Sequence, residues 1–133
     1  MDDRLFRHTA TLFLFIGFLD FFANKLYLYW TTWWFDMVLH FLSGGVVAMV
    51  AILFLQSISK TKGLNRREIF LVAILSACFV GFLWEVFEIY FEVTYFSDGF
   101  VYWTDTLSDL FFDLFGGFLG IKYSFRILDK NTK

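Results

Sequence analysis

The chain has 133 residues and a formal net charge of −2 at pH 7, and its composition is strongly apolar, with 59% hydrophobic and 24% aromatic residues. Soluble domains carry about a quarter charged residues, whereas this chain has 18%, so the composition is typical of a protein that lies in lipid. The length excludes a large additional soluble domain, and no basic patch or glycine-rich phosphate loop indicates a nucleic-acid or nucleotide partner.

Four apolar segments follow one another along the chain, at about residues 5–29, 33–58, 69–96 and 106–127. Each is long enough to cross a hydrocarbon core of about 30 Å, which takes roughly 20 helical residues. The first segment follows Arg4 and Arg7, but no small-residue cleavage site comes after it, so we interpret it as a retained helix and not as a signal peptide. The sequence therefore predicts an all-α fold, a four-helix transmembrane bundle that forms a single domain over residues 1–133.

The connections between these segments are short, namely 30–32, the polar run 59–68, and 97–105, in which Asp98-Gly99 is a turn signal. Short connections require that neighbouring helices run antiparallel.

The positive residues predict the orientation, because Lys and Arg are retained on the cytoplasmic side of membrane proteins. The chain has eleven Lys and Arg residues, and Lys25 is the only one expected on the side opposite to the termini. The others lie on the side of the termini: Arg4, Arg7, Lys60, Lys62, Arg66, Arg67, Lys122, Arg126, Lys130 and Lys133. Aromatic residues of an interfacial belt gather on the Lys25 side: Tyr27, Tyr29, Trp30, Trp33, Trp34, Tyr95, Tyr102 and Trp103. Both signals predict cytoplasmic termini in a multi-pass protein of a cell membrane.

Acidic residues and one histidine recur at helical spacing in the last three segments. Steps of three or four residues turn such side chains to one face of a helix. The sets are Asp36 with His40, Glu85 with Glu88, and Asp105 with Asp109 and Asp113. Small residues continue the same stripes inward: Gly44, Gly81, Gly116 and Gly120. Since polar groups turn away from acyl chains and small residues let helices approach, these faces are predicted to meet inside the outer half of the bundle.

These acids need compensation if they are ionised, because a charged carboxylate at mid-helix costs about 2.5–3.5 kcal/mol even on an insertion-based scale. Asp20, Glu92 and Asp105 lie near predicted helix ends, where contact with water explains them equally well. For the deeper acids the remedies are protonation, water in a cavity or a bound cation. Lys25 is the only basic side chain near this side, so salt bridges cannot compensate them.

A divalent cation is the remedy that we favour. Carboxylate oxygens with a single imidazole suit Mg²⁺, Mn²⁺, Ca²⁺ or Fe²⁺, and Zn²⁺ also accepts such ligands. The predicted metal ligands are Asp36, His40, Glu85 and Asp109, with Glu88 or Asp113 as general base.

Taken in order, these motifs resemble the VanZ-like and YjdF-type group of small bacterial membrane proteins. The resemblance runs over about 85 residues, through Asp36-x-x-x-His40-Phe41-x-x-Gly44, Trp84-Glu85-x-x-Glu88 and Asp105-Thr106-x-x-Asp109 to Gly116 and Gly120. It is closer to the YjdF-type branch, because Glu88 and Asp113 stand where VanZ-like members tend to carry Gln and Asn. The resemblance implies a helical membrane fold without an established reaction. The extra acids favour cation binding and argue against a VanZ role in glycopeptide resistance.

The leading functional hypothesis is a metal-dependent hydrolase or transferase that acts on a lipid or lipid-linked envelope substrate at the outer face. A bound cation would lower the pKa of water, and the general base would take its proton. The first alternative is a proton or cation transporter or channel, since intramembrane Asp, Glu and His also form proton relays. The second is a non-catalytic binding or accessory subunit. The predicted partners are membrane lipids and a lipid-linked substrate, without nucleic acid, and the sequence leaves the oligomeric state open.

Overall fold

The computed structural model describes residues 1–58, 63–91 and 96–130, and nothing in these ranges is a β-strand. The elements are α1 (Asp3–Leu26), α2 (Leu28–Thr31), α3 (Phe35–Ser57), α4 (Arg66–Tyr90), the 3₁₀ turn η2 (Phe96–Asp98) and α5 (Phe100–Lys130). The prediction of an all-α protein is therefore confirmed for the described residues.

The first half of the chain departs from the predicted bounds at one point. The segment expected to form one helix over 5–29 ends at Leu26, because Tyr27 adopts a left-handed conformation with φ 56°. Its backbone N–H still bonds to the carbonyl of Ala23, so Tyr27 closes α1 and turns the chain into the single-turn helix α2. The predicted connection at 30–32 is thus partly helical, whereas the segment predicted over 33–58 agrees closely with α3.

In the second half of the chain, both long helices begin earlier in the sequence than expected. Helix α4 begins at Arg66, because the Asn65 side chain accepts from the Glu68 N–H while the Glu68 carboxylate accepts from the Asn65 N–H. It ends at Tyr90, and residues 92–95 of the predicted segment, with Glu92 and Tyr95, lie outside the described residues. Gly99 makes the predicted turn at φ 59°, after which α5 extends beyond the predicted 106–127 at both ends.

Three of the helices, α1, α3 and α4, are long and apolar enough to cross a membrane. The fourth predicted span lies within α5, which has 31 residues but is not among these three. Its first half carries Asp105, Asp109 and Asp113 and its second half carries Lys122 and Arg126, so charged residues are spread along the whole of α5. The structure thus supports three candidate spans.

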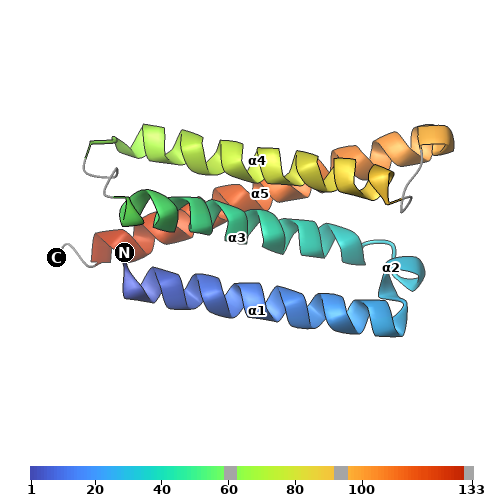
Figure 1. The fold of residues 1–133 in the computed structure, drawn as a ribbon, viewed down its shortest axis with the longest axis horizontal. Coiled ribbons are helices and arrows are strands. Elements are labelled where there is room, and N and C mark those ends of the chain that lie inside the picture. Colours follow the sequence, from blue (N-terminus) through green and yellow to red (C-terminus); the bar gives the residue numbers. More distant parts are fainter. Residues whose placement is uncertain (59–62, 92–95, 131–133) are drawn as a thin grey trace.

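The four long helices lie side by side with alternating directions (Figure 1), which confirms the predicted antiparallel arrangement. Helix α3 lies between α1 and α4, and α5 packs along α3 and α4. The start of α1, the end of α5 and the facing ends of α3 and α4 share one end of the molecule. That end carries the described basic residues other than Lys25, namely Arg4, Arg7, Arg66, Arg67, Lys122, Arg126 and Lys130. Lys60, Lys62 and Lys133 lie outside the described residues.

Glycines hold α3 and α5 in backbone contact. A Cβ atom at Gly44 would collide with the carbonyl oxygen of Asp113, and one at Gly116 would collide with that of Phe41. A Cβ atom at Gly120 would lie 2.6 Å from the carbonyl oxygen of Gly45, which is also too close. The predicted small-residue stripes therefore do bring helices together. Toward the basic end the interior is mainly apolar, with Leu5, Ile52 and Ile121 fully buried, and the buried acids of the described chain lie in the other half.

Candidate functional site

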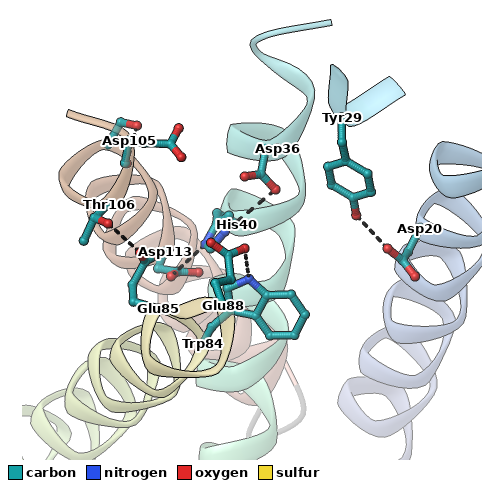
Figure 2. A network of polar contacts seen from close by, with 11 residues as sticks. Asp20, Tyr29, Asp36, His40, Trp84, Glu85, Glu88, Asp105, Thr106 and Asp113 are labelled. Atoms are coloured by element: carbon teal, nitrogen blue, oxygen red, sulfur yellow. Dashed lines mark hydrogen bonds and ion pairs between the residues drawn. The ribbon is translucent and has the colours of Figure 1, made fainter. Parts of the chain in front are cut away.

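The acidic stripes of α3, α4 and α5 converge in the half of the bundle away from the basic end (Figure 2). Helix α3 contributes its first two turns, α4 its last two turns and α5 its first half. The side chains from these helices are Asp36 and His40, Glu85 and Glu88, and Asp105, Asp109 and Asp113. We refer to these seven residues as the acidic cluster.

His40 is buried at the centre of the acidic cluster and has a carboxylate on each side. Its Nδ1 lies 3.1 Å from Oδ2 of Asp113, which is also buried. An ionised carboxylate can only accept a hydrogen bond, so we assign the ring hydrogen to Nδ1. The other ring nitrogen, Nε2, lies 3.9 Å from Oδ1 of Asp36 and is left as an acceptor. Asp113 therefore orients the imidazole from behind and leaves Nε2 free to bind a ligand.

Glycine also makes room for Asp113. A Cβ atom at Gly81 of α4 would collide with Oδ2 of Asp113, so the carboxylate lies against the α4 backbone. The third helix of the site is thus close enough to fix the Asp113 side chain, and through it His40.

Glu85 and Asp109 are almost completely buried, with 4% and 2% of their surface exposed. Thr106 donates a hydrogen bond of 2.7 Å to Oε2 of Glu85. Among the described residues, the other oxygen, Oε1, has no hydrogen-bond partner, and Oδ1 of Asp109 has none either. Buried polar atoms are nearly always paired, because leaving one unpaired costs about 1–3 kcal/mol. Two unpartnered carboxylate oxygens in one interior therefore require an explanation.

The remaining acids lie closer to the surface. Glu88 is half-buried and accepts a hydrogen bond of 2.9 Å from the Trp84 indole. Asp105 is exposed although it continues the stripe of Asp109, which agrees with the solvated interpretation. Asp36 is half-buried. The position of Glu92 lies outside the described residues.

Asp20 of α1 is exposed and belongs to a separate polar contact at the same end of the molecule. Its Oδ1 accepts a hydrogen bond of 2.6 Å from the Tyr29 hydroxyl and one of 3.1 Å from the Asn24 amide. Burial and the neighbouring Asp20 carboxylate raise the pKa of the Tyr29 phenol above its usual range, so Tyr29 stays protonated and donates. Figure 2 shows this pair across from Asp36.

Two overlapping sets of ligand atoms have metal-site dimensions. His40, Glu85 and Asp109 form a fully buried set, and Asp36, His40 and Glu88 form a more accessible one. In each set one atom per residue can be chosen so that all lie within 4.8 Å of one another. Ligands of one ion cannot be farther apart than twice the bond length, about 4.2–4.8 Å for Mg²⁺ to Ca²⁺ distances of roughly 2.1–2.4 Å. A spacing of up to 4.8 Å meets the limit for Ca²⁺, and the buried set contains Glu85 and Asp109, the two residues that each have an unpartnered oxygen.

Basic side chains do not compensate the cluster. Among the described residues, the one ion pair between an acid and a Lys or Arg joins Arg66 to Asp129, at the opposite end. Lys25 lies with its Nζ 4.8 Å from the centre of the Phe21 ring on α1. No described Lys or Arg therefore forms an ion pair with a member of the acidic cluster.

A cavity of about 260 Å³ adjoins the acidic cluster. Its walls come from α1, α3 and α4, and Asp113 of α5 contributes at its base. The polar end is formed by Asp20, Tyr29, Asp36 and His40, and the lining becomes apolar toward the basic end of the molecule. The cavity is a feature that sequence patterns did not reveal, because it depends on how far α1 stands from α4.

The spacing along each helix identified which residues face the site, but it did not show which residues of different helices lie next to one another. The structure brings all six predicted site residues into one region, in two sets rather than one, since Asp36 groups with Glu88 and not with Glu85 and Asp109. Sequence reasoning did not assign Thr106 a structural role, although its position three residues before Asp109 places both on one face.

Comparison with known proteins gave one match. The family described as "Predicted membrane protein (DUF2238)" matches residues 4–130. No match was found among curated proteins or among solved structures. The YjdF-type side of the resemblance corresponds to this family, and no comparison supports the VanZ-like side.

Proposed function

We propose that this chain, which belongs to the DUF2238 family of predicted membrane proteins, binds a divalent cation in the acidic cluster and uses it on a lipid or lipid-linked substrate. The observation that carries the proposal is the pair of buried, unpartnered oxygens, Oε1 of Glu85 and Oδ1 of Asp109. Both belong to residues that share a ligand set with His40. A cation between them would supply the partner that each lacks.

The proposed ligands are His40, Glu85 and Asp109, and Asp36 lies outside this set, in the more accessible one with His40 and Glu88. His40 would bind through Nε2, because Nδ1 is bonded to Asp113. Metal-binding histidines commonly carry such a carboxylate on the other ring nitrogen, which fixes the ring and raises its basicity. Asp113 therefore fits an orienting role better than the role of general base. Oxygen ligands with one nitrogen favour Mg²⁺, Mn²⁺, Ca²⁺ or Fe²⁺.

The proposed topology has four membrane crossings, with α5 as the fourth and both termini in the cytoplasm. Helix α5 supports a crossing because its 31 residues are enough to span a bilayer and because Asp109 and Asp113 are buried in the interior of the bundle. The basic end of the bundle supports the orientation, since positive residues are retained on the cytoplasmic side. The acidic cluster would then lie in the outer half of a cell membrane.

For the chemistry, we propose hydrolysis or group transfer. Glu88 is half-buried, belongs to the accessible ligand set with Asp36 and His40, and is the carboxylate best placed to take a proton. In hydrolysis, water would add across the bond that breaks, its proton would pass to Glu88, and the leaving oxygen would take a proton in turn.

Transport is the alternative that the sequence leaves open, and it needs polar groups that continue to the basic end. In the described part of the chain, the buried hydroxyls there bond to carbonyls of their own helices, Thr9 to Leu5 and Ser124 to Gly120. Between α3 and α5, glycines bring the backbones into contact below Asp113. These observations favour a site that opens to one side only.

The test is a metal analysis of the purified full-length protein, followed by titration of the metal-stripped protein with Mg²⁺, Mn²⁺, Ca²⁺, Fe²⁺ and Zn²⁺. We expect the wild type to retain a cation that the variants Asp109→Asn and His40→Ala do not retain. The matched control is Asp105→Asn, because Asp105 lies on the same stripe but is exposed. It should bind like the wild type.

The binding proposal is wrong if the wild type holds no more cation than Asp109→Asn. Proton flux into voltage-clamped liposomes, abolished by Glu85→Gln, would instead support transport. The enzyme part is tested separately, by incubating the loaded protein with extracted membrane lipids and following their release products by mass spectrometry. No product above that of Glu88→Gln would contradict it.

A further inference from the structure

We propose that the cavity between α1 and α4 holds the hydrocarbon chain of a membrane phospholipid with an ammonium headgroup, which enters sideways from the bilayer. This proposal rests on the proposed function, because it names the substrate class of the same site. The arguments concern the shape of the cavity, its open side and the charge at its polar end.

The cavity is long and runs parallel to the helices. Its lining on α3 extends from Asp36 to Val47, about 16 Å at 1.5 Å per residue. On α1 it extends from Phe13 to Asp20, and on α4 from Ala77 to Trp84. In candidate spans such a groove points along the bilayer normal, as acyl chains do. The volume of about 260 Å³ is slightly below that of ordinary small-molecule pockets, roughly 300–1,000 Å³, so it fits one part of a larger ligand.

The groove is accessible from the side of the molecule. Its floor is α3, and its two walls, α1 and α4, flank α3 on opposite sides (Figure 1). Wall residues are exposed, with 64% of the Phe13 surface and 44% of the Val80 surface accessible. Because α1 and α4 are candidate spans, these residues face acyl chains in a membrane. A lipid chain can therefore enter between the walls without leaving the bilayer.

Gly17 keeps part of this space open. A Cβ atom added there would meet nothing within 4 Å, in contrast to the closely packed glycines of α3 and α5. Gly17 lies on α1 between Phe13 and Asp20, level with the middle of the groove. A larger side chain at this position would enter the groove without striking the backbone of another helix.

The polar end of the groove determines the headgroup. Asp20 and Asp36 lie at this end and Asp113 lies at the base of the groove, and the described lining contains no Lys or Arg. A cationic headgroup complements this charge, whereas a net-anionic lipid without an ammonium group would be repelled. His40 at the same end belongs to both ligand sets, so a phosphate beside the ammonium group would lie next to the proposed cation. In this arrangement the hydrocarbon chain would lie along the apolar lining and the phosphate beside the proposed cation. The ammonium group would lie beside Asp20 and Asp36.

The experiment uses the full chain in nanodiscs made of phosphatidylglycerol, doped with phosphatidylethanolamine that carries a photoreactive group in its acyl chain. After irradiation, cross-linked peptides are quantified by mass spectrometry. We expect preferential labelling of the segments around Phe13 and Val80. Gly17→Leu should lower this labelling several-fold, because the new side chain occupies the groove.

Two matched controls accompany it. Gly17→Ala adds a single carbon and should label like the wild type. Leu14→Phe enlarges a neighbouring α1 residue that is 70% exposed and does not line the groove, and it too should have no effect. Equal loss of labelling in Leu14→Phe and Gly17→Leu, or no loss in either, would overturn the groove proposal.

The headgroup preference is tested by exchanging the two lipids, so that phosphatidylglycerol carries the photoreactive group and phosphatidylethanolamine forms the nanodisc. Photoreactive phosphatidylglycerol that labels the groove as strongly as the ethanolamine lipid would overturn the ammonium assignment. Cation binding is measured on the same samples, since Gly17→Leu leaves every proposed ligand in place. If the protein retains the cation but is labelled uniformly, only the proposal of a lipid-binding groove is contradicted. If the groove is labelled selectively but the protein retains no cation, only the proposal of cation binding is contradicted.

Discussion

At the scale of single residues, the acidic cluster consists of side chains that differ mainly in what they contact. Among the described residues, His40 and Asp113 form a hydrogen-bonded pair, Glu85 is bonded through one oxygen only, and Asp105 is exposed. Residues of the same chemical type therefore have different expected roles, which substitution can separate.

Asp113→Asn tests the orientation of His40. The amide keeps the size of the side chain but no longer accepts a hydrogen bond from Nδ1 with the strength of a carboxylate. We expect cation affinity to fall by about 10–100-fold, the usual effect of losing the carboxylate behind a metal-binding histidine. Isothermal titration of the metal-stripped protein measures this. An unchanged affinity, with Asp105→Asn as the reference, would contradict the orienting role.

Thr106→Val tests the hydrogen bond to Glu85. Valine has nearly the same shape but leaves Oε2 of Glu85 buried without a donor, which should destabilise the protein by about 1–3 kcal/mol. Thr106→Ser keeps the hydroxyl and should recover most of this stability. Unfolding curves in detergent, recorded with and without cation, provide the measurement. Equal stability of the Val and Ser variants would show that the hydrogen bond contributes nothing.

The sequence predicted which residues face the interior, because spacing of three or four residues is a property of one helix. It could not predict that Asp36 groups with Glu88 or that Asp113 bonds to His40, since those pairings depend on the axial offset between helices. The spacing of Asp105 and Asp109 is equally regular, yet only Asp109 is buried.

At the scale of elements, close contact between α3 and α5 depends on their glycines. Gly116→Ala would place a methyl group against the carbonyl oxygen of Phe41, and relief requires the two helices to separate. We expect a destabilisation of at least about 1–3 kcal/mol, typical of an overpacked interior, and weaker cation binding because Asp113 and His40 lie on the separated helices.

Gly17→Ala is the matched control for this change. Its methyl group meets open space, and alanine is favoured over glycine in a helix by about 1 kcal/mol, so stability should be unchanged or higher. Thermal unfolding of both variants in the same detergent compares them directly. A Gly116→Ala protein as stable as Gly17→Ala would mean that the helices are not in contact at this position.

Helix existence was predictable from length and hydropathy, but several ends were not. The left-handed Tyr27 that ends α1 carries no sequence signal, because residues other than glycine and asparagine seldom adopt this conformation. The start of α4 is different, since Asn65 and Glu68 form a recognisable pair three residues apart.

At the scale of the whole molecule, the arrangement of charge predicts a single orientation. In a Cys78→Ala background, Lys130→Cys should react with a membrane-impermeant maleimide only after the membrane is opened, if the basic end faces the cytoplasm. Trp33→Cys, at the opposite end, should react in intact spheroplasts. The reverse pattern would contradict the proposed topology, and reaction of both cysteines in intact cells would contradict the fourth crossing by α5.

Composition alone does not decide how many times the chain crosses the membrane. Three spans are recognisable because each has a long apolar stretch with few charged residues, whereas α5 combines four acids with Lys122, Arg126 and Lys130. Whether such a helix crosses a membrane depends on burial of its acids by α3 and α4, which a hydropathy average does not include.

The backbone contact between α3 and α5 also has a kinetic consequence. With Gly44 and Gly116 closing the space below Asp113, a molecule that reaches His40 through the groove must leave by the way it came. For an enzyme of this design, substrate and product would share one entrance. A product that kept its hydrocarbon chain would then compete with the next substrate, and turnover would be governed by how fast the surrounding bilayer carries the product away.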